Sequence, residues 1–210
     1  MSSSPRHPSL ALAAICLAAL MFGLEISSVP IILPVLEARL HAGFRDLQWI
    51  MNAYTIACTT VLMATGTLAD RYGRRRMFAS AVLAFGVASL LCGLAPGTPV
   101  LIAARFLQGM AGGAMFICSI AILSHQFPDG QARGRAFAIW GVVAGIGLGF
   151  GPVVGGAIIA LASWHWVFLA HVPLALLGLA LIMAGVAESR DPLARQQKLD
   201  LAGIVTLTTA

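Results

Sequence analysis

The stretch AFAIWGVVAGIGLGFGPVVGGAIIALASWHWVFLAHVPLALLGLALIMAGVA, residues 136–187, decides the fold of this chain. It holds 52 residues without an Asp, Glu, Lys or Arg. A helix needs about 20 apolar residues to cross the roughly 30 Å of hydrocarbon in a bilayer, and a helix satisfies its own backbone hydrogen bonds there. We therefore expect two membrane-spanning helices, with the turn between them at Ser163, Trp164 and His165.

The rest of the chain continues this pattern. Only 10% of the 210 residues are charged, against about 25% in a soluble domain, which argues against a soluble enzyme. The net charge of +5 does not indicate nucleic-acid binding, because the charges avoid the long apolar runs. A seventh apolar run starts at residue 201 and is cut off at residue 210, so we expect the front part of a longer protein. Six complete spans are predicted at residues 10–33, 47–69, 77–94, 100–123, 136–162 and 166–187.

Basic residues in the short loops predict the orientation, since Lys and Arg concentrate on the cytoplasmic side. A cytoplasmic N-terminus places ten basic residues inside and two, Arg39 and Arg45, outside. We predict a multi-pass protein of the inner (plasma) membrane with a cytoplasmic N-terminal tail (residues 1–9), a six-helix bundle (10–187), a cytoplasmic linker (188–200) and the truncated start of a seventh helix (201–210). All four cysteines lie inside spans without zinc-type spacing, so no metal site or cofactor is expected.

Two residues of fixed charge, Glu25 and Arg105, lie inside predicted spans. A charge at mid-bilayer costs at least about 2.5–3.5 kcal/mol, so such residues usually face a partner or a water-filled cavity. Their distances from Pro34 and Pro99 place both in the outer half of the membrane at similar depths. Two interpretations are open: a structural ion pair, or proton exchange or cation binding at Glu25. Burial favours the protonated carboxyl group, whereas a nearby arginine favours the ionised one.

Polar side chains near these two charges predict a cavity. Three of them lie at i, i+3 and i+7 on the second span, and another shares a face with Arg105 on the fourth. Hydrogen bonding between helices is the alternative role for such residues. His171, in the sixth span, is interpreted as a packing residue rather than a proton site. The predicted substrate cavity is lined by Asn52, Tyr54, Thr55, Thr59 and Gln108.

The fifth span carries two rows of glycines spaced by four residues. Such rows let a neighbouring backbone approach closely, and the proline among them removes one helix hydrogen bond. Close packing accounts for one row, and two rows on one helix favour a bendable or sliding contact. The two rows are Gly141, Gly145 and Gly149, and Gly147, Gly151 and Gly155, and to them are added Pro152 and Gly156.

Between the second and third spans lies GTLADRYGRRR, residues 66–76. Gly73 is able to supply a positive φ for the tight reversal. Asp70 at the end of one helix and Arg74 at the start of the next are suited to a switchable ion pair. A topology signal with lipid headgroup contact would explain the arginines but not Asp70 and the paired glycines.

Three stretches resemble motifs of the major facilitator superfamily, in the order and on the helices where that family has them. They are GTLADRYGRRR, LIAARFLQGMAGG (residues 101–113) and GIGLGFGPVVGG (145–156), the last of which is similar to an antiporter motif. In the first, the matching positions are Gly66, Asp70, Arg71, Gly73, Arg74 and Arg75.

Finer features resemble the fourteen-helix drug:proton antiporter branch of this superfamily. They are LEISSVPIILP (residues 24–34), WIMNAY (49–54), WHWVFLAHVP (164–173) and the short linker before the seventh run. Glu25 stands where that branch usually has Asp. The chain departs from the first-helix motif at Ser27, Ser28 and Pro30.

The resemblance implies an all-α membrane fold: two inverted three-helix repeats plus the start of a seventh helix, the N-terminal half of such a transporter. It implies proton-coupled efflux of small amphipathic compounds, with Glu25 and Arg105 in proton coupling, the residue 66–75 motif as a cytoplasmic gate and the glycine helix as a sliding contact. The implied partners are a small-molecule substrate, protons, the lipid bilayer and the missing C-terminal half. Export of a native metabolite, or a non-transporting receptor or scaffold with the same fold, stays open; no enzyme is expected.

Overall fold

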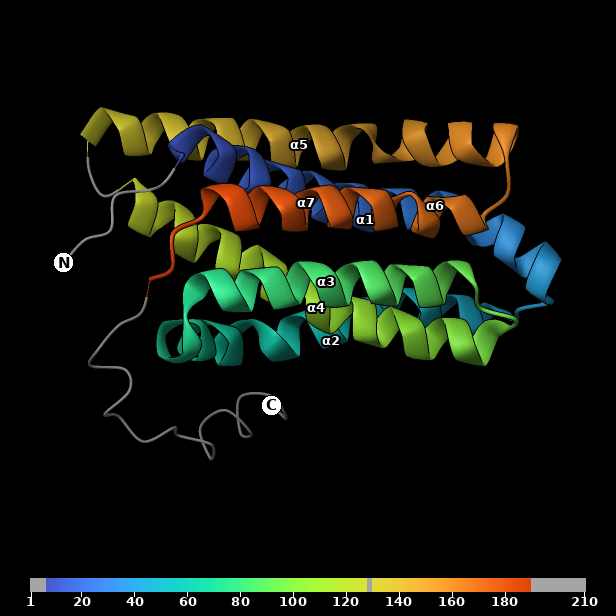
Figure 1. Cartoon of the computed structure of the whole chain (residues 1–210). Helices are drawn as coiled ribbons and strands as arrows, with labels where there is room; N and C mark the ends of the chain where they lie inside the picture. Colours follow the sequence, from blue (N-terminus) through green and yellow to red (C-terminus); the bar gives the residue numbers. More distant parts are fainter. Residues whose placement is uncertain (1–6, 128–129, 190–210) are drawn as a thin grey trace.

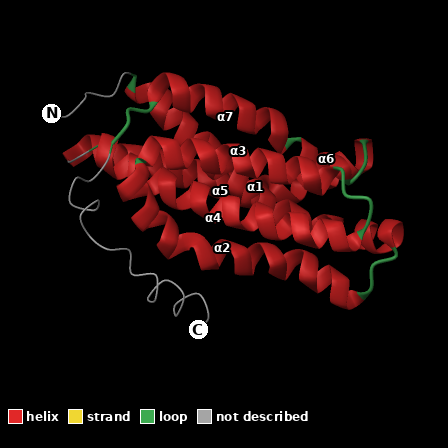
Figure 2. Ribbon diagram, turned by 60° about the horizontal axis from the view of Figure 1, so that its bottom comes forward, coloured by secondary structure: helices red, strands yellow, loops and turns green. Residues whose placement is uncertain are grey.

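A computed structural model describes residues 7–127 and 130–189, which form a bundle of helices lying side by side (Figure 1). In these ranges the chain contains helices and loops but no strand, so the predicted all-α fold is confirmed (Figure 2). The helices are α1 (Pro8–Leu40), α2 (Phe44–Tyr72), α3 (Arg74–Gly93), α4 (Thr98–Gln126), α5 (Gly130–Leu161), α6 (His165–Leu169) and α7 (His171–Gly185).

The predicted spans match these helices, with α6 and α7 sharing the sixth. The turn predicted at residues 163–165 is confirmed, because α5 ends at Leu161 and α6 begins at His165. Several helices are longer than predicted: α1 continues to Leu40 and α5 already begins at Gly130. The predicted seventh run, and the linker beyond residue 189, lie outside the described residues.

Hydropathy separates α2 from the other helices. Within residues 7–127 and 130–189, five segments are long and apolar enough to cross a membrane: α1, α3, α4, α5, and α6 with α7 taken together. The second predicted span, on α2, is not among them although α2 has 29 residues. Its sequence carries Asn52 and several threonines, which lower its hydropathy.

Glycine and proline help to set the helix ends. Gly73 lies between α2 and α3 with φ of +112°, so the predicted positive φ at this turn is confirmed. Pro8 and Pro99 fall in the first turns of α1 and α4, where a missing N–H has no helical partner to lose. Pro152 lies inside α5, which continues through it to Leu161. Prolines are tolerated inside membrane helices where neighbours satisfy the freed carbonyl groups.

The helix contacts have an internal symmetry. α1 packs against α5, and α4 packs against α2, so the first helix of each three-helix set contacts the second helix of the other. Likewise, α3 contacts α4 as α7 contacts α1. Two interlocked repeats, α1 to α3 and α4 to α7, account for this pattern. The repeats expected from the motif resemblance are therefore visible in the packing.

The two ends of the bundle differ in charge. The start of α1, the α2–α3 turn, the start of α5 and the end of α7 gather at one end, and the α1–α2, α3–α4 and α5–α6 connections lie at the opposite end (Figure 1). The first, which we call the arginine-rich end, carries Arg133 and Arg135 besides the arginines of the α2–α3 turn. The second carries Arg39 and Arg45. This distribution is the one on which the predicted orientation rests.

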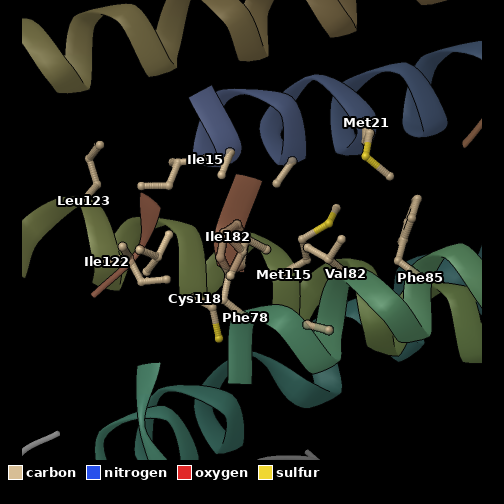
Figure 3. Close-up of a cluster of buried hydrophobic side chains, with 14 of the residues drawn as sticks. Ile15, Met21, Phe78, Val82, Phe85, Met115, Cys118, Ile122, Leu123 and Ile182 are labelled. Carbon is tan, nitrogen blue, oxygen red and sulfur yellow. The ribbon is translucent and has the colours of Figure 1, made fainter. Parts of the chain in front are cut away.

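The larger apolar core lies between α1, α3, α4 and α7, towards the arginine-rich end. Ile15 and Met21 point from α1 towards Met115, Val82 and Phe85 on the facing helices (Figure 3). A second apolar cluster, which includes Ile32, Leu36 and Phe168, fills the other end. The charged residues inside the bundle lie between these two clusters along α1, since Glu25 falls between Met21 and Val29.

Candidate functional site

Glu25 and Arg105 meet in the interior of the bundle. Glu25 is on α1 and Arg105 on α4, the first helices of the two repeats. Arg105 Nη1 donates a hydrogen bond to Glu25 Oε1, and the two side chains are 1% and 0% exposed. The similar depth predicted for these two residues is thus confirmed by direct contact.

Arg105 is held by three further groups. Its Nε donates to the backbone carbonyl of Ile50 on α2 at 3.1 Å, and its Nη1 donates to Gln108 Oε1 at 2.6 Å. The guanidinium carbon lies 4.3 Å from the centre of the Tyr54 ring, a cation–π contact. A buried guanidinium needs such partners, because an unpaired charge in a low-dielectric interior is costly. The position of Arg105 is therefore fixed by α1, α2 and its own helix.

Gln108 extends this network to the third helix. Its side-chain Nε2 donates to Ser89 Oγ on α3 at 2.9 Å, while its Oε1 accepts from Arg105. Cys92 Sγ, also on α3, lies 3.5 Å from the same oxygen. Gln108 and Ser89 are both fully buried. The hydrogen bonds thus run continuously from Glu25 on α1 to Ser89 on α3.

His171 belongs to the same cluster, although sequence reasoning gave it a packing role. Its Nδ1 lies 3.5 Å from Glu25 Oε2, and its side chain is 4% exposed. It opens α7 directly after Ala170, which separates α6 from α7. The signal that could have identified it is its ionisable side chain within a run of apolar residues. Only the fold reveals that this run packs against Glu25.

The residues predicted to line the cavity separate into two groups. Tyr54 and Gln108 are buried beside Arg105. The remaining three lie on the exposed side of α2. The two threonine hydroxyls among them donate to carbonyls of their own helix, Thr55 to Met51 and Thr59 to Ile56. This exposed group is Asn52, Thr55 and Thr59.

The two glycine rows of α5 also face different surroundings. Gly147, Gly151 and Gly155 are buried against α1, and a Cβ built at Gly147 would lie 2.8 Å from the carbonyl oxygen of Leu20. Ser27 and Ser28, two departures from the first-helix motif, are the α1 residues that Gly151 and Gly155 approach. A Cβ at the remaining four glycines would meet nothing within 4 Å: these are Gly141, Gly145, Gly149 and Gly156.

At the arginine-rich end, Asp70 and Arg74 form the ion pair that their spacing suggested. Arg74 Nη2 and Nε lie 2.8 and 3.0 Å from Asp70 Oδ1, across the Gly73 turn. The neighbouring Arg71 stacks over Tyr72 at 5.9 Å. A Cβ at Gly66, one turn before Asp70, would meet nothing within 4 Å, so this glycine is not needed for close packing inside the described bundle.

A contact that the sequence did not indicate reinforces this end. Glu188, just after α7, accepts a hydrogen bond from the backbone N–H of Arg75 at 3.3 Å and lies 3.6 Å from Arg76 Nε. The Arg74 N–H donates to the Ser189 carbonyl at 3.0 Å. The segment after α7 therefore caps the N-terminus of α3, where backbone N–H groups lack helical partners.

The chemistry available at the buried cluster is that of proton and cation binding. It combines a carboxylate, a guanidinium and an imidazole, all shielded from water. Among the residues that the structure describes, no group of three or more His, Cys, Asp or Glu side chains could hold a metal ion. The cluster thus offers groups that are able to bind a proton or a cation.

Comparisons with known proteins give a consistent picture. The sequence model of the Major Facilitator Superfamily matches residues 15–208. The chain is 35% identical over 190 residues to the drug efflux pump JefA of Mycobacterium tuberculosis, covering 90% of this chain and 37% of the pump. It is 34% identical over 206 residues to the tetracenomycin C resistance and export protein of Streptomyces glaucescens, covering 97% of this chain and 38% of that protein.

The fold also matches a solved transporter. A crystal structure of the peptide transporter POT in complex with sulfate superimposes with a TM-score of 0.75 at 18% identity, covering 97% of this chain and 44% of that one. At this identity the match concerns the fold alone. The chain thus spans well under half the length of the relatives that it matches.

Proposed function

This chain belongs to the Major Facilitator Superfamily, and from this premise we propose that it is the N-terminal half of a secondary transporter that exports small amphipathic compounds in exchange for protons. The proposal rests most directly on one observation, the buried Glu25–Arg105 pair at the centre of the bundle. The relatives named as drug efflux and resistance proteins support the substrate class. The sequence-based orientation, with the N-terminus in the cytoplasm, belongs to the same proposal.

Proton coupling would depend on the charge of Glu25. When the carboxylate is ionised, it balances Arg105 and ties α1 to α4. When a proton or a cationic substrate neutralises it, that tie weakens and Arg105 becomes available to other partners. A ligand shifts a conformational equilibrium only through its different affinity for the two states. A proton on Glu25 satisfies this condition, because its binding changes an interhelical ion pair.

The exposed side of the bundle would face the second half of the transporter. The open glycine row of α5 and the polar stripe of α2 offer, respectively, a close-packing surface and hydrogen-bonding groups. Small residues favour close helix approach in a membrane, where packing rather than hydrophobicity drives association. The α2 stripe of Asn52, Thr55 and Thr59 would then line a central substrate cavity rather than lie in lipid.

The arginine-rich end would work as the cytoplasmic gate. Asp70 and Arg74 bridge α2 and α3, and both side chains remain partly exposed. A partly exposed ion pair is weak enough to be exchanged for contacts with a moving second half. The ion pair would form in one conformational state and break in the other, so its presence would depend on the relative position of the two halves.

The decisive test measures proton-driven export in everted membrane vesicles that contain the protein expressed from its complete reading frame. In everted vesicles, export from the cell appears as uptake into the lumen. The wild type should take up a cationic dye when the lumen is made more acidic than the outside, and Glu25→Gln should abolish this flux. Glu37→Gln is the matched control, because Glu37 is an exposed carboxylate on the same helix. Full gradient-driven export by Glu25→Gln would refute the coupling role, and ligand binding without flux in the wild type would instead identify a receptor.

A further inference from the structure

The surroundings of the His171 ring are unusual for a neutral histidine. Nδ1 lies 3.1 Å from the Val167 carbonyl oxygen and 3.5 Å from Glu25 Oε2. Nε2, on the opposite side of the ring, lies 3.3 Å from the Met21 carbonyl oxygen. Carbonyl and carboxylate oxygens only accept hydrogen bonds. Both ring nitrogens therefore face acceptors in a site that is almost fully buried.

A neutral imidazole carries one N–H, so one of its nitrogens would direct a lone pair at an oxygen. The imidazolium ion carries two N–H groups and satisfies both sides. Glu25 Oε2 gives independent support, because this buried oxygen accepts no hydrogen bond among the residues that the structure describes. The Nδ1–H bonds to the Val167 carbonyl oxygen, and the positive charge of the imidazolium, 3.5 Å from Oε2, would balance the negative charge of this oxygen. The geometry thus suits a charged His171 beside an ionised Glu25.

We propose that His171 is the second proton-binding group of this transporter, and that it shares the exchanged proton with Glu25. The inference rests on the proposed antiport function and deepens it. Two interacting groups that share a proton titrate as a pair, with apparent values that belong to both. The pH at which the site loads and releases its proton would then be set by the pair rather than by Glu25 alone.

The charges around the pair explain why a histidine matters here. The titratable groups that face it are Glu25 on α1, Tyr54 on α2, Cys92 on α3 and Arg105 on α4, while α5 has no titratable residue between Ala136 and Leu161. A proton placed on Glu25 leaves Arg105 without its counter-ion in a buried site. A proton placed on His171 keeps the carboxylate ionised between two cations. Breaking a buried pair by neutralising one partner is the costlier arrangement.

The position of His171 also offers a route from protonation to movement. The ring connects α7 to the Met21 carbonyl on α1, and it packs in a T-shaped arrangement with the Phe85 ring on α3, with centroids 5.6 Å apart. Met21 and Phe85 lie at the same end of the apolar cluster in Figure 3. Loss of the proton removes one of the two ring N–H donors, and with it a hydrogen bond on one side of the ring. Because His171 adjoins the break at Ala170, α7 is well placed to respond.

The first test compares the pH dependence of export in wild type and His171→Gln, each expressed from its complete reading frame. Glutamine keeps a hydrogen-bonding side chain but cannot carry the proton. We expect export to continue with its half-maximal point displaced by about one pH unit towards acid, a tenfold weaker apparent proton affinity. His165→Gln is the matched control, since His165 lies only six residues away and its ring contacts Ser163 and Trp164 instead. Export with an unchanged pH profile would overturn the proposal.

A second measurement covers the case in which His171→Gln does not fold or does not export. Nitrogen-15 NMR of histidine-labelled wild type in lipid reports the protonation of each ring. We expect the ring-nitrogen signals of one histidine to change in Glu25→Gln and to stay as in the wild type in the control Glu37→Gln. If no histidine responds to Glu25→Gln, the shared proton is disproved even where wild-type export is proton-driven. Absence of proton-driven export in the wild type would instead overturn the proposed function.

Discussion

The molecule contains two ion pairs of similar chemistry in opposite surroundings. Glu25 and Arg105 are 0% and 1% exposed between the two apolar clusters, whereas Asp70 and Arg74 are 39% and 22% exposed at the arginine-rich end. Both pairs join a carboxylate to a guanidinium on different helices. Because the residue types are alike, we expect burial to decide what each ion pair contributes to the stability of the bundle.

The physical reason is the solvation of the charges. Removing one partner of a buried pair leaves an uncompensated charge in a low-dielectric interior. Removing one partner of an exposed pair leaves a charge that water and salt solvate readily. Breaking the Glu25–Arg105 pair is therefore expected to cost enough free energy to favour one conformational state of the protein over another. The Asp70–Arg74 pair is expected to form and break between states at little cost in free energy. Four predictions test this contrast.

The largest effect is expected for Arg105→Met, which leaves the buried Glu25 without its guanidinium partner. The free energy of unfolding should fall by about 3–5 kcal/mol, measured by denaturant unfolding of the protein in detergent micelles. The double variant Glu25→Gln with Arg105→Met should recover most of this loss, because no charge then remains in the pair. Equal instability of the single and double variants would contradict the assignment of the loss to the unpaired carboxylate.

Gln108→Leu should have the next largest effect. It removes the acceptor of an Arg105 N–H and the donor to Ser89 Oγ, and both groups are buried. An unsatisfied buried polar group costs about 1–3 kcal/mol. Ser89→Ala is the control and should cost less, because it leaves the contact between Arg105 and Gln108 in place. The same unfolding measurement on both variants gives the comparison, and a larger loss for Ser89→Ala would be inconsistent with it.

Glu188→Gln should have a smaller effect at the arginine-rich end. The amide still accepts a hydrogen bond from the Arg75 N–H but loses the negative charge beside Arg76 and the N-terminus of α3. Charges at helix termini contribute about 0.3–1 kcal/mol. Thermal unfolding at low ionic strength measures this loss. The difference from wild type should disappear at about 1 M salt, where the screening length is only about 3 Å; a difference that persists would argue against a charge effect.

Asp70→Asn should have the smallest effect on stability, about 0.2–1 kcal/mol, because its ion pair with Arg74 is partly exposed. Increasing salt should reduce it further, whereas the loss caused by Arg105→Met should hardly change with salt. Denaturant unfolding at two salt concentrations compares the two variants directly. A loss at Asp70 as large as that at Arg105 would remove the proposed distinction between the two regions.

Residue patterns predicted some of these features and missed others. The depth of Glu25 and Arg105 followed from counting residues to Pro34 and Pro99, because helical rise is constant. The positive φ of Gly73 followed from the need for a tight reversal. The contact between His171 and Glu25 did not follow, because which side of the sixth span faces α1 depends on helix rotation. The capping of α3 by Glu188 joins segments over a hundred residues apart, and no local pattern encodes it.

The sequence by itself determined that this chain is a helical membrane protein with expensive charges inside it, since hydropathy and helix length depend only on local composition. The tertiary structure alone decided which of two glycine rows on α5 packs against α1, and which polar residues of α2 are buried beside Arg105. It also brought Glu25, Arg105 and His171 into one cluster. The reason is that periodicity fixes which residues share a face of a helix, whereas only packing against other helices decides what each face meets.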